Sequence, residues 1–221
     1  MRATTKQLTF ERRGGARRGA GRKPKGAKPL VSRRKRTKIS RHVPVLVTIK
    51  IRNGLPSLRS RSVVELLHAA FEAAGDRHGL RLVHFSIQAT HVHMIVEAPD
   101  KLSLSRGMQG MCVRIARALN RLWGRKGPVF VDRFHSQPLR SPRQARNALC
   151  YTLNNARKHE IQLSGIDPCS SGLAFDGWRD ARGLAPPLAG LPVHAPQSWL
   201  LTEGWLKHGL IGVTETPHAR G

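Results

Sequence analysis

The chain has 221 residues, which is enough for one ordinary domain with extensions and for a hydrophobic core that needs no disulfide bonds. Its three cysteines have spacings that fit neither a zinc finger nor a paired disulfide framework. The sequence contains no apolar leader segment and no run of about 18 apolar residues, so we expect a cytoplasmic protein that does not span a membrane.

Positive charge dominates the composition. The 39 lysines and arginines outnumber the 13 acidic residues and give a formal net charge of +26. Residues 1–41 hold 16 basic residues against one acidic residue, residues 42–159 hold 19 against 6, and residues 160–221 hold 4 against 6. Nucleic acid is the natural partner for such a charge, because binding phosphates releases counterions. Charge that only aids solubility, or that binds acidic lipid, is the alternative, although no basic amphipathic helix is visible in the first 41 residues.

Residues 1–40 are predicted to form a basic, disordered arm that binds DNA. The stretch from Arg12 to Gly26 reads RRGGARRGAGRKPKG, which is rich in glycine and charge and has almost nothing to bury. Its segment Gly21-Arg22-Lys23-Pro24 is similar to an AT-hook core, which lays arginines along a narrow minor groove. A nonspecific phosphate-binding arm needs only the charge. In either case we expect DNA contacts from Arg17, Arg18, Arg22 and Lys23.

Residues 41–160 have the pattern of one α+β domain. Alternating or β-branched apolar residues predict strands at 42–51, 81–88, 91–97 and 129–139. Apolar residues at helical spacing predict helices at 59–76 and 103–123, and Ser141-Pro142 begins a third helix that runs to about His159. The order is the ferredoxin-like βαββαβ arrangement, a four-stranded antiparallel sheet with two helices on one face, followed here by an added C-terminal helix.

Two histidines lie at alternate positions of the third predicted strand. His91 and His93 in HVHMIVE leave the same face of the strand, while Val92, Met94 and Val96 point the opposite way, toward the two helices. Imidazoles at this spacing can share one divalent cation. By itself the pattern is also typical of a half-exposed histidine pair that binds no metal.

The single tyrosine of the chain lies in the middle of the last predicted helix. Asn155 follows Tyr151 by four residues in LCYTLNNARKH and therefore shares its face. A phenol on a helix can act as a covalent nucleophile once it is ionised or paired with a base. The amide oxygen of Asn155 can complete a His-His-Asn metal site beside it. A core tyrosine with a polar neighbour is the alternative that these residues alone leave open.

Together the two motifs resemble those of the single-tyrosine HUH transposases, the family of the IS200-like transposases. HVHMIVE is similar to the HUH motif, and YTLNNARKH is similar to the catalytic-helix signature, a tyrosine with asparagine or glutamine four positions on. The asparagine form, followed by a basic residue, is closer to the REP-associated tyrosine transposases. The resemblance covers about residues 41–160 and includes the order and spacing of both motifs.

The resemblance implies a metal-dependent endonuclease and transesterase that acts on single-stranded DNA at hairpin-forming elements, and hence a nucleoid-associated protein. Tyr151 would be the nucleophile, with His91, His93 and Asn155 as ligands of one Mg²⁺ or Mn²⁺ ion. Attack on a phosphodiester would give a 5′-phosphotyrosine link and a free 3′-hydroxyl. A 3′-hydroxyl can attack back, so strands rejoin without a nucleotide cofactor. We expect Arg114, Arg117 and Arg121 to help the arm hold the hairpin, in either a monomer or a homodimer.

The chain departs from the family pattern at two places. Ala89-Thr90 stands where a proline and a polar residue commonly precede the HUH motif. FVDRFHSQPLR stands where a WQRRYHDH-like run is usual, with Phe134 in the aromatic position and Arg133 and His135 retained in type. Arg133 and His135 are candidates for contact with the scissile phosphate, and an ordinary exposed strand face is the alternative.

Residues 161–221 are predicted to form a tail that packs on the core or helps to bind DNA. The tail is irregular apart from a short helical segment at 199–210. Its tryptophans Trp178, Trp199 and Trp205 either stack bases or anchor the tail on the core. Anchoring is favoured because the tail lacks positive charge.

Two other functions fit parts of the pattern. A noncatalytic nucleic-acid-binding module would use the same sheet, but the first and third strands lack the exposed aromatic residues that stack bases. A zinc hydrolase would combine the H-x-H pair with a distant carboxylate, but it leaves Tyr151 and Asn155 without a role.

Overall fold

The computed structural model describes residues 39–75, 77–158, 165–180 and 190–216. The predicted arm lies outside these residues except for its last two positions, so its four expected DNA contacts, Arg17, Arg18, Arg22 and Lys23, are not part of the description that follows. None of the described helices is long and apolar enough to cross a membrane.

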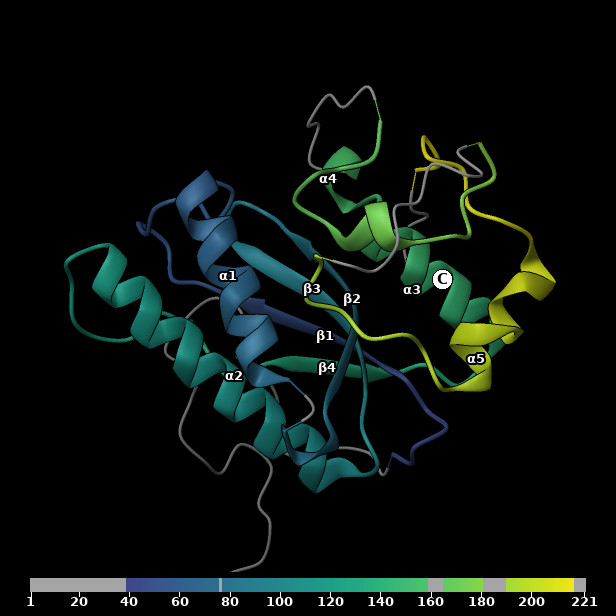
Figure 1. Cartoon of the computed structure of the whole chain (residues 1–221), viewed down its shortest axis with the longest axis horizontal. Coiled ribbons are helices and arrows are strands. Elements are labelled where there is room, and N and C mark those ends of the chain that lie inside the picture. The colour runs from purple at the N-terminus through teal and green to yellow at the C-terminus, as the bar shows by residue number, and fades with distance from the viewer. Residues whose placement is uncertain (1–38, 76, 159–164, 181–189, 217–221) are drawn as a thin grey trace, which may run out of the picture. The chain divides into compact units, whose positions relative to one another are not determined.

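Four strands form one antiparallel sheet in the order β2-β3-β1-β4 (Figure 1). Their bounds are β1 Val45–Lys50, β2 Arg81–Ile87, β3 His91–Glu97 and β4 His135–Pro138. The central pair, β1 and β3, is rich in β-branched residues, which suit a pleated surface buried on both sides. The strand order confirms the predicted ferredoxin-like βαββαβ topology.

Two helices, α1 (Arg61–Ala74) and α2 (Lys101–Leu122), lie side by side on one face of the sheet (Figure 1). The helix α1 ends at Gly75, whose φ of 45° favours glycine, and α2 begins at Asp100, whose side chain accepts a hydrogen bond from the backbone N–H of Ser103. One continuous core joins both helices to the odd positions of β1 and the even positions of β3. Val92, Met94 and Val96 therefore face α1 and α2, as predicted.

The second face of the sheet is covered by the helix α3 (Pro142–Leu153) and by segments that follow it in the chain. These segments are the 3-10 turns η2 (Ser171–Ala174) and η3 (Gly204–His208) and the short helix α5 (Trp199–Thr202). Trp178 and Trp205 are buried there, at 1% and 3% exposure, whereas Trp199 is 47% exposed. The first two tryptophans thus hold the tail on the sheet.

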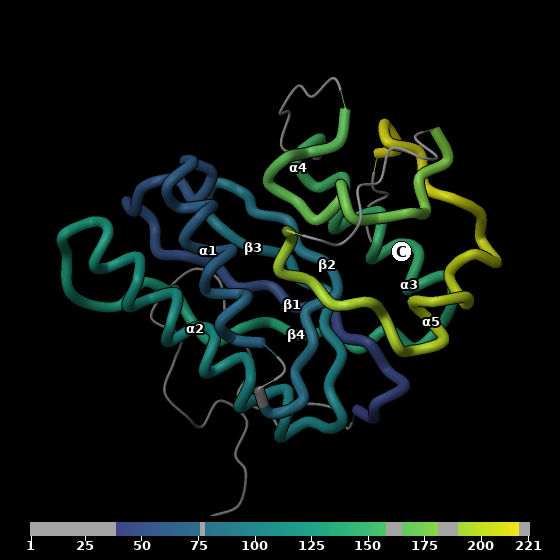
Figure 2. Tube along the Cα trace, in the orientation of Figure 1, coloured from purple at the N-terminus to yellow at the C-terminus, as the bar shows by residue number. Residues whose placement is uncertain are grey.

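The tail also covers the outer edge of β2. The backbone N–H of Ile87 donates to the carbonyl of Cys169 (2.8 Å), and the N–H of His194 donates to the carbonyl of Leu82 (2.8 Å). In Figure 2 the trace of residues 190–198 runs past β2 toward α5. Glu97, at the end of β3, accepts hydrogen bonds from the backbone N–H groups of Gln197 and Ser198. An edge strand with unpaired backbone groups can pair with strands of other chains. Here two tail segments form backbone hydrogen bonds with part of that edge.

The fourth strand is shorter than the sequence predicts. Pairing starts at an isolated bridge between Ile51 and Phe130, stops, and resumes only at His135. Between them the chain leaves the ladder, and Phe134 turns into the core beneath α1 and α2. The prediction of one strand over 129–139 was therefore wrong, because the pairing with β1 is interrupted before His135.

The helix that carries Tyr151 is also interrupted. It begins at Pro142 with Ser141 as its cap, as predicted, but it ends at Leu153 and continues as a separate turn, α4 (Asn155–Lys158). At the break, the side-chain amide of Asn154 donates to the carbonyls of Gly212 and Glu215, at 3.0 and 2.9 Å. These tertiary hydrogen bonds accompany the break in the helix. The predicted end of the helix near His159 lies outside the described residues.

A buried histidine lies under the tail. His84, beside a bulge in β2, has Nδ1 3.2 Å from the hydroxyl of Ser171 and its ring edge-on to Phe175. Burial lowers the pKa of His84 to about 4. The imidazole is therefore neutral in the folded protein at neutral pH.

The low pKa of His84 predicts a pH-dependent loss of stability. The unfolded chain binds a proton near the ordinary value of about 6.5, so stability is present above that pH and is lost as the pH falls toward 4. We expect this residue to account for a loss of about 3 kcal/mol between pH 7 and pH 4. Urea denaturation at both pH values should show a smaller loss for His84→Gln. An unchanged loss would contradict the assignment.

Candidate functional site

Strand register places a set of polar side chains on the second face of the sheet. His93 pairs with Thr48 on β1 and with Ser86 on β2, and Thr48 in turn pairs with His135 on β4. Paired residues on antiparallel strands share a face, so these four side chains form a row across the sheet. His91 pairs with Lys50 in the next row.

The two histidines lie next to each other with similar partners. Their ring centroids are 4.7 Å apart at an interplanar angle of 80°. Thr48 Oγ1 lies 2.9 Å from Nδ1 of His93, and Thr90 Oγ1 lies 3.3 Å from Nδ1 of His91. When each Nδ1–H donates to its threonine, Nε2 is the unprotonated nitrogen of each ring, the one able to bind a metal. The two threonines thereby orient the rings, as hydrogen-bond partners of metal-bound histidines do.

Sequence reasoning missed the role of Thr48 because only strand pairing brings it beside His93. Thr90 was noted as a departure from the usual pattern before the histidines, and its hydroxyl contacts His91. A polar residue directly before the motif was the available signal for that contact.

Tyr151 approaches the histidines from α3. Its Oη lies 3.4 Å from Nε2 of His93, and the two ring centroids are 4.8 Å apart. The side chain is partly buried, so the hydroxyl group faces His93 at the margin of the apolar packing between α3 and the sheet. The structure thus brings together His91, His93 and Tyr151, which are far apart in the sequence.

Asn155 follows one turn after Tyr151 and is fully buried. Within the described residues, neither its amide oxygen nor its amide nitrogen has a hydrogen-bond partner. Leaving such a group unsatisfied costs about 1–3 kcal/mol, so a buried amide in this position calls for a ligand or a partner.

The residues present fit a divalent cation. Imidazole nitrogens and amide oxygens are donors that divalent cations accept, and the amide of Asn155 has no partner among the described residues. In the described ranges no three His, Cys, Asp or Glu side chains form a cluster that could hold a metal. A cation at the histidine pair would therefore need oxygen donors of another kind.

The end of the tail holds α3 in place. Arg146 donates to both carboxylate oxygens of Glu215, at 2.7 and 2.9 Å, and to the carbonyls of Gly209 and Leu210, both at 3.0 Å. This hydrogen bond from Arg146 lowers the pKa of Glu215 and raises that of Arg146. Arg146 on α3 and Asn154 directly after it are therefore tied to one short segment, which restrains the helix that carries Tyr151.

The other predicted DNA contacts lie at different places. His135 belongs to the row of Thr48 and His93, and both it and Arg133 are exposed. Arg114, Arg117 and Arg121 lie on α2, which covers the opposite face of the sheet. The structure does not bring these three arginines together with Tyr151.

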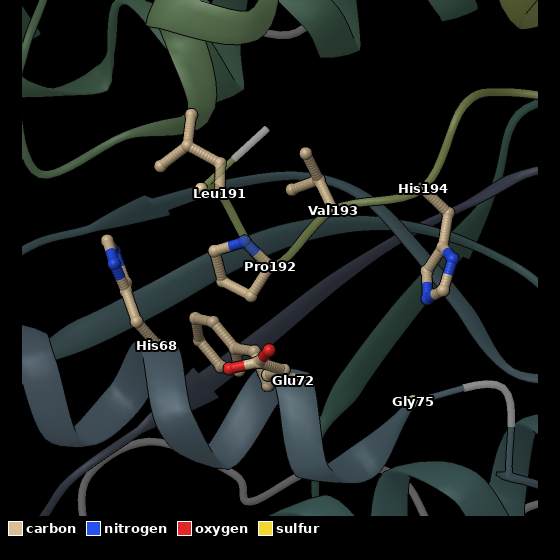
Figure 3. Close-up of a pocket in the computed structure, with 9 residues that line it drawn as sticks. His68, Glu72, Gly75, Leu191, Pro192, Val193 and His194 are labelled. Atoms are coloured by element: carbon tan, nitrogen blue, oxygen red, sulfur yellow. The ribbon is translucent and has the colours of Figure 1, made fainter. Parts of the chain in front are cut away.

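Two hollows lie away from the histidines. One of about 260 Å³ lies between α1 and residues 190–194, with His68 and His194 at its opposite ends (Figure 3). The second, of about 590 Å³, lies between His84, Phe175 and the tail. Neither is lined by His91, His93 or Tyr151, so the candidate site is not in either hollow.

A comparison with protein-family models matches the part of the chain that contains the histidine pair. Residues 38–137 match the sequence model of the family described as "Transposase IS200 like". Almost half of the chain is thus similar to this family. The match contains both histidines and ends before Tyr151 and Asn155. No curated protein matches the sequence.

Two solved structures are similar to this chain. A REP-associated tyrosine transposase bound to a REP hairpin is 18% identical, with a TM-score of 0.54, and the similarity covers 78% of this chain and 94% of that one. A protein from Deinococcus radiodurans R1, described as a transposase, is 13% identical with a TM-score of 0.37, over 61% of this chain and 93% of that one. The first similarity supports the α+β fold.

We expect Glu215→Gln to lower the free energy of unfolding by about 1–3 kcal/mol, because a partly buried charged pair is replaced by a weaker hydrogen bond. The stabilisation depends on a carboxylate with a lowered pKa, so it is present above about pH 4.3 and is lost as the pH falls through the folded-state pKa. Denaturation at pH 7 and pH 3 measures both effects.

Glu65→Gln is the matched control, because the ion pair of Glu65 with Arg61 is exposed. That change should stay within about 0.5 kcal/mol at either pH. Equal effects of the two substitutions would contradict the role given to Glu215.

Proposed function

We propose that this chain is a transposase, a metal-dependent, single-strand DNA endonuclease and transesterase with Tyr151 as its nucleophile. The observation that carries the proposal is the phenol oxygen of Tyr151, 3.4 Å from Nε2 of His93 and on the side of the sheet to which His91 also points. A lone nucleophile beside a pair of potential metal ligands suits phosphodiester chemistry.

The reaction begins with attack of Tyr151 Oη on the phosphorus of a DNA phosphodiester. The phenol loses its proton, the new bond joins Oη to phosphorus, and the bond from phosphorus to the 3′-oxygen breaks. The 3′-oxygen leaves as a hydroxyl after it takes up a proton, and the 5′-phosphate stays on Tyr151. Attack by a 3′-hydroxyl reverses these steps and joins strands, so no nucleotide cofactor is consumed.

His91, His93 and Asn155 are proposed to hold one Mg²⁺ or Mn²⁺ ion. When bound, the ion would polarise a nonbridging phosphate oxygen and favour in-line displacement. Thr48 and Thr90 hold the two imidazoles by their Nδ1 atoms, and the buried amide of Asn155 gains the partner it lacks among the described residues.

Hairpin DNA is the proposed substrate. The fold-related REP-associated transposase is bound to a REP hairpin, and this chain has the positive charge that such a partner needs. Residues 1–40 would serve as a DNA-binding arm, residues 41–160 as the endonuclease domain, and the tail from 161 as a support for α3. Arg133 and His135 are proposed to reach the DNA near the scissile phosphate.

The helix α2 is proposed to bind the DNA backbone away from the reaction. Its 22 residues include no acidic residue, and in the described part of the chain no ion pair involves Arg114, Arg117 or Arg121. By contrast, Arg59, Arg81 and Arg146 are each paired with a carboxylate.

A noncatalytic DNA-binding protein is the second candidate, because the same basic surface would serve it. Covalent chemistry separates the two functions. The transposase should form an adduct with labelled single-stranded hairpin oligonucleotides from the flanks of its own gene in the presence of Mn²⁺. On denaturing gels the adduct should be absent for Tyr151→Phe, since phenylalanine keeps the ring but lacks Oη.

Trp199→Phe, a change at an exposed aromatic residue, is the control and should retain the adduct. An adduct that persists in Tyr151→Phe would exclude Tyr151 as the nucleophile. Tight binding without any adduct in the unaltered protein would favour the noncatalytic function.

Replacing Arg114, Arg117 and Arg121 together by glutamine should weaken binding to hairpin DNA and reduce the salt dependence of that binding. Each lost phosphate contact lowers the slope of log K against log salt by about 0.9, so we expect a decrease of about 2–3. Filter binding between 50 and 300 mM salt (roughly the range where screening changes most) measures the slope.

The control carries the same change of charge at Arg61, Arg179 and Lys207, which lie on other elements. It should leave the slope near that of the unaltered protein. If both triple variants lose affinity equally, general charge and not the face of α2 is responsible.

A further inference from the structure

Gln88 lies beside the histidine pair at the end of β2. Its backbone N–H donates to the carbonyl of His91 (2.8 Å), which continues the pairing of Ile87 with Val92. Gln88 is therefore the cross-strand neighbour of His91, as Ser86 is of His93. The four side chains form a two-by-two array on the second face of the sheet, with typical Cβ separations of about 4.5–5.5 Å between neighbours across the strands.

The amide of Gln88 is buried and only half satisfied. The residue is 2% exposed, and its Nε2 donates to the hydroxyl of Ser86 at 2.8 Å. That hydrogen bond holds the amide over the histidine face, because residues two apart on a strand share a face. Its Oε1 is buried and has no partner among the described residues. If the amide oxygen and nitrogen were exchanged, Oε1 would accept from Ser86 and Nε2 would be the unpaired atom, so the present orientation is the one that leaves an oxygen for a cation.

Two amides near the candidate site are thus unpartnered among the described residues, Gln88 beside His91 at the end of β2 and Asn155 one turn after Tyr151. Both are buried, and each leaves unsatisfied an oxygen that hard divalent cations prefer. Mg²⁺ and Mn²⁺ favour about six ligands, more than two imidazoles and one amide supply. A further neutral oxygen adds a ligand without adding charge to a strongly basic protein.

We propose that Gln88 Oε1 is a further protein ligand of the divalent cation held at His91, His93 and Asn155. The inference rests on the metal site of the proposed function and adds a donor from β2. Ser86 is a positioning residue, because it holds the amide by Nε2 and leaves Oε1 to bind the ion. The tail segment around Cys169, hydrogen-bonded to Ile87, closes the outer edge of β2 beside this ligand.

Mn²⁺ binding to the full chain tests the inference without relying on DNA cleavage. Electron paramagnetic resonance titration measures the dissociation constant for the unaltered protein and for two variants. Gln88→Met keeps the length of the side chain but has no hard oxygen donor, and it should weaken Mn²⁺ binding about 10-fold or more. Gln88→Glu provides a charged oxygen in the same place and should bind Mn²⁺ at least as tightly as the unaltered protein.

Ser198→Ala is the matched control, since it removes another buried, unpartnered oxygen near Glu97 at the opposite end of β3. Its Mn²⁺ affinity should equal that of the unaltered protein, and melting curves without metal check that each variant folds. Equal affinity of Gln88→Met and the unaltered protein would overturn the role of Gln88 and leave the His-His-Asn site standing. The same holds if Gln88→Glu binds Mn²⁺ more weakly. If the unaltered protein binds no Mn²⁺, the proposed metal site itself fails.

Discussion

The antiparallel pairing of β3 with its neighbours is the constraint on which the rest of the molecule depends. The period of two along β3 sends Val92, Met94 and Val96 into one core and turns His91 and His93 to the other face. A slip of one residue would exchange these faces, placing imidazoles in the apolar core and valines at the site. Burial of the apolar set therefore fixes the position of the polar set.

The second face of the sheet has an apolar part, which packs against α3 and the tail, and a polar part, which carries the candidate site. At the Glu97 end of β3, the apolar residues Leu46, Val83 and Ile95 pack under α3 and the tail. At the other end the same face carries threonine, serine, glutamine and histidine side chains, and it is there that Tyr151 contacts His93. The apolar half holds α3 on the sheet, and the polar half supplies the groups near its tyrosine. Stability and site geometry thus depend on one interface.

The tail carries a small net negative charge in a strongly basic chain. Two of its acidic residues pair with arginines of the domain, Asp167 with Arg59 and Glu215 with Arg146. The arginines of α2 are left out of such pairs among the described residues, so the charge of the tail is directed to internal contacts. This division of charge separates arginines that hold the fold from arginines that remain available to a polyanion.

The sequence alone predicted the sheet topology, both layers of the first core and the shared face of His91 and His93. These features follow from local periodicity, which a single strand or helix displays without its partners. It also identified Tyr151 and Asn155 as a pair one helical turn apart, although the break at Asn154 was not expected. That break involves carbonyls of Gly212 and Glu215, nearly 60 residues away in the chain.

The residues that surround the histidines could be identified only from their tertiary contacts. Thr48 reaches His93 through strand pairing, and Gln88 reaches His91 through the turn between β2 and β3. Arg146 pairs with Glu215, which lies in a tail whose sequence has little periodic pattern. Contacts of this kind depend on register and long-range closure, and a side chain carries no local mark of the partner that it will meet.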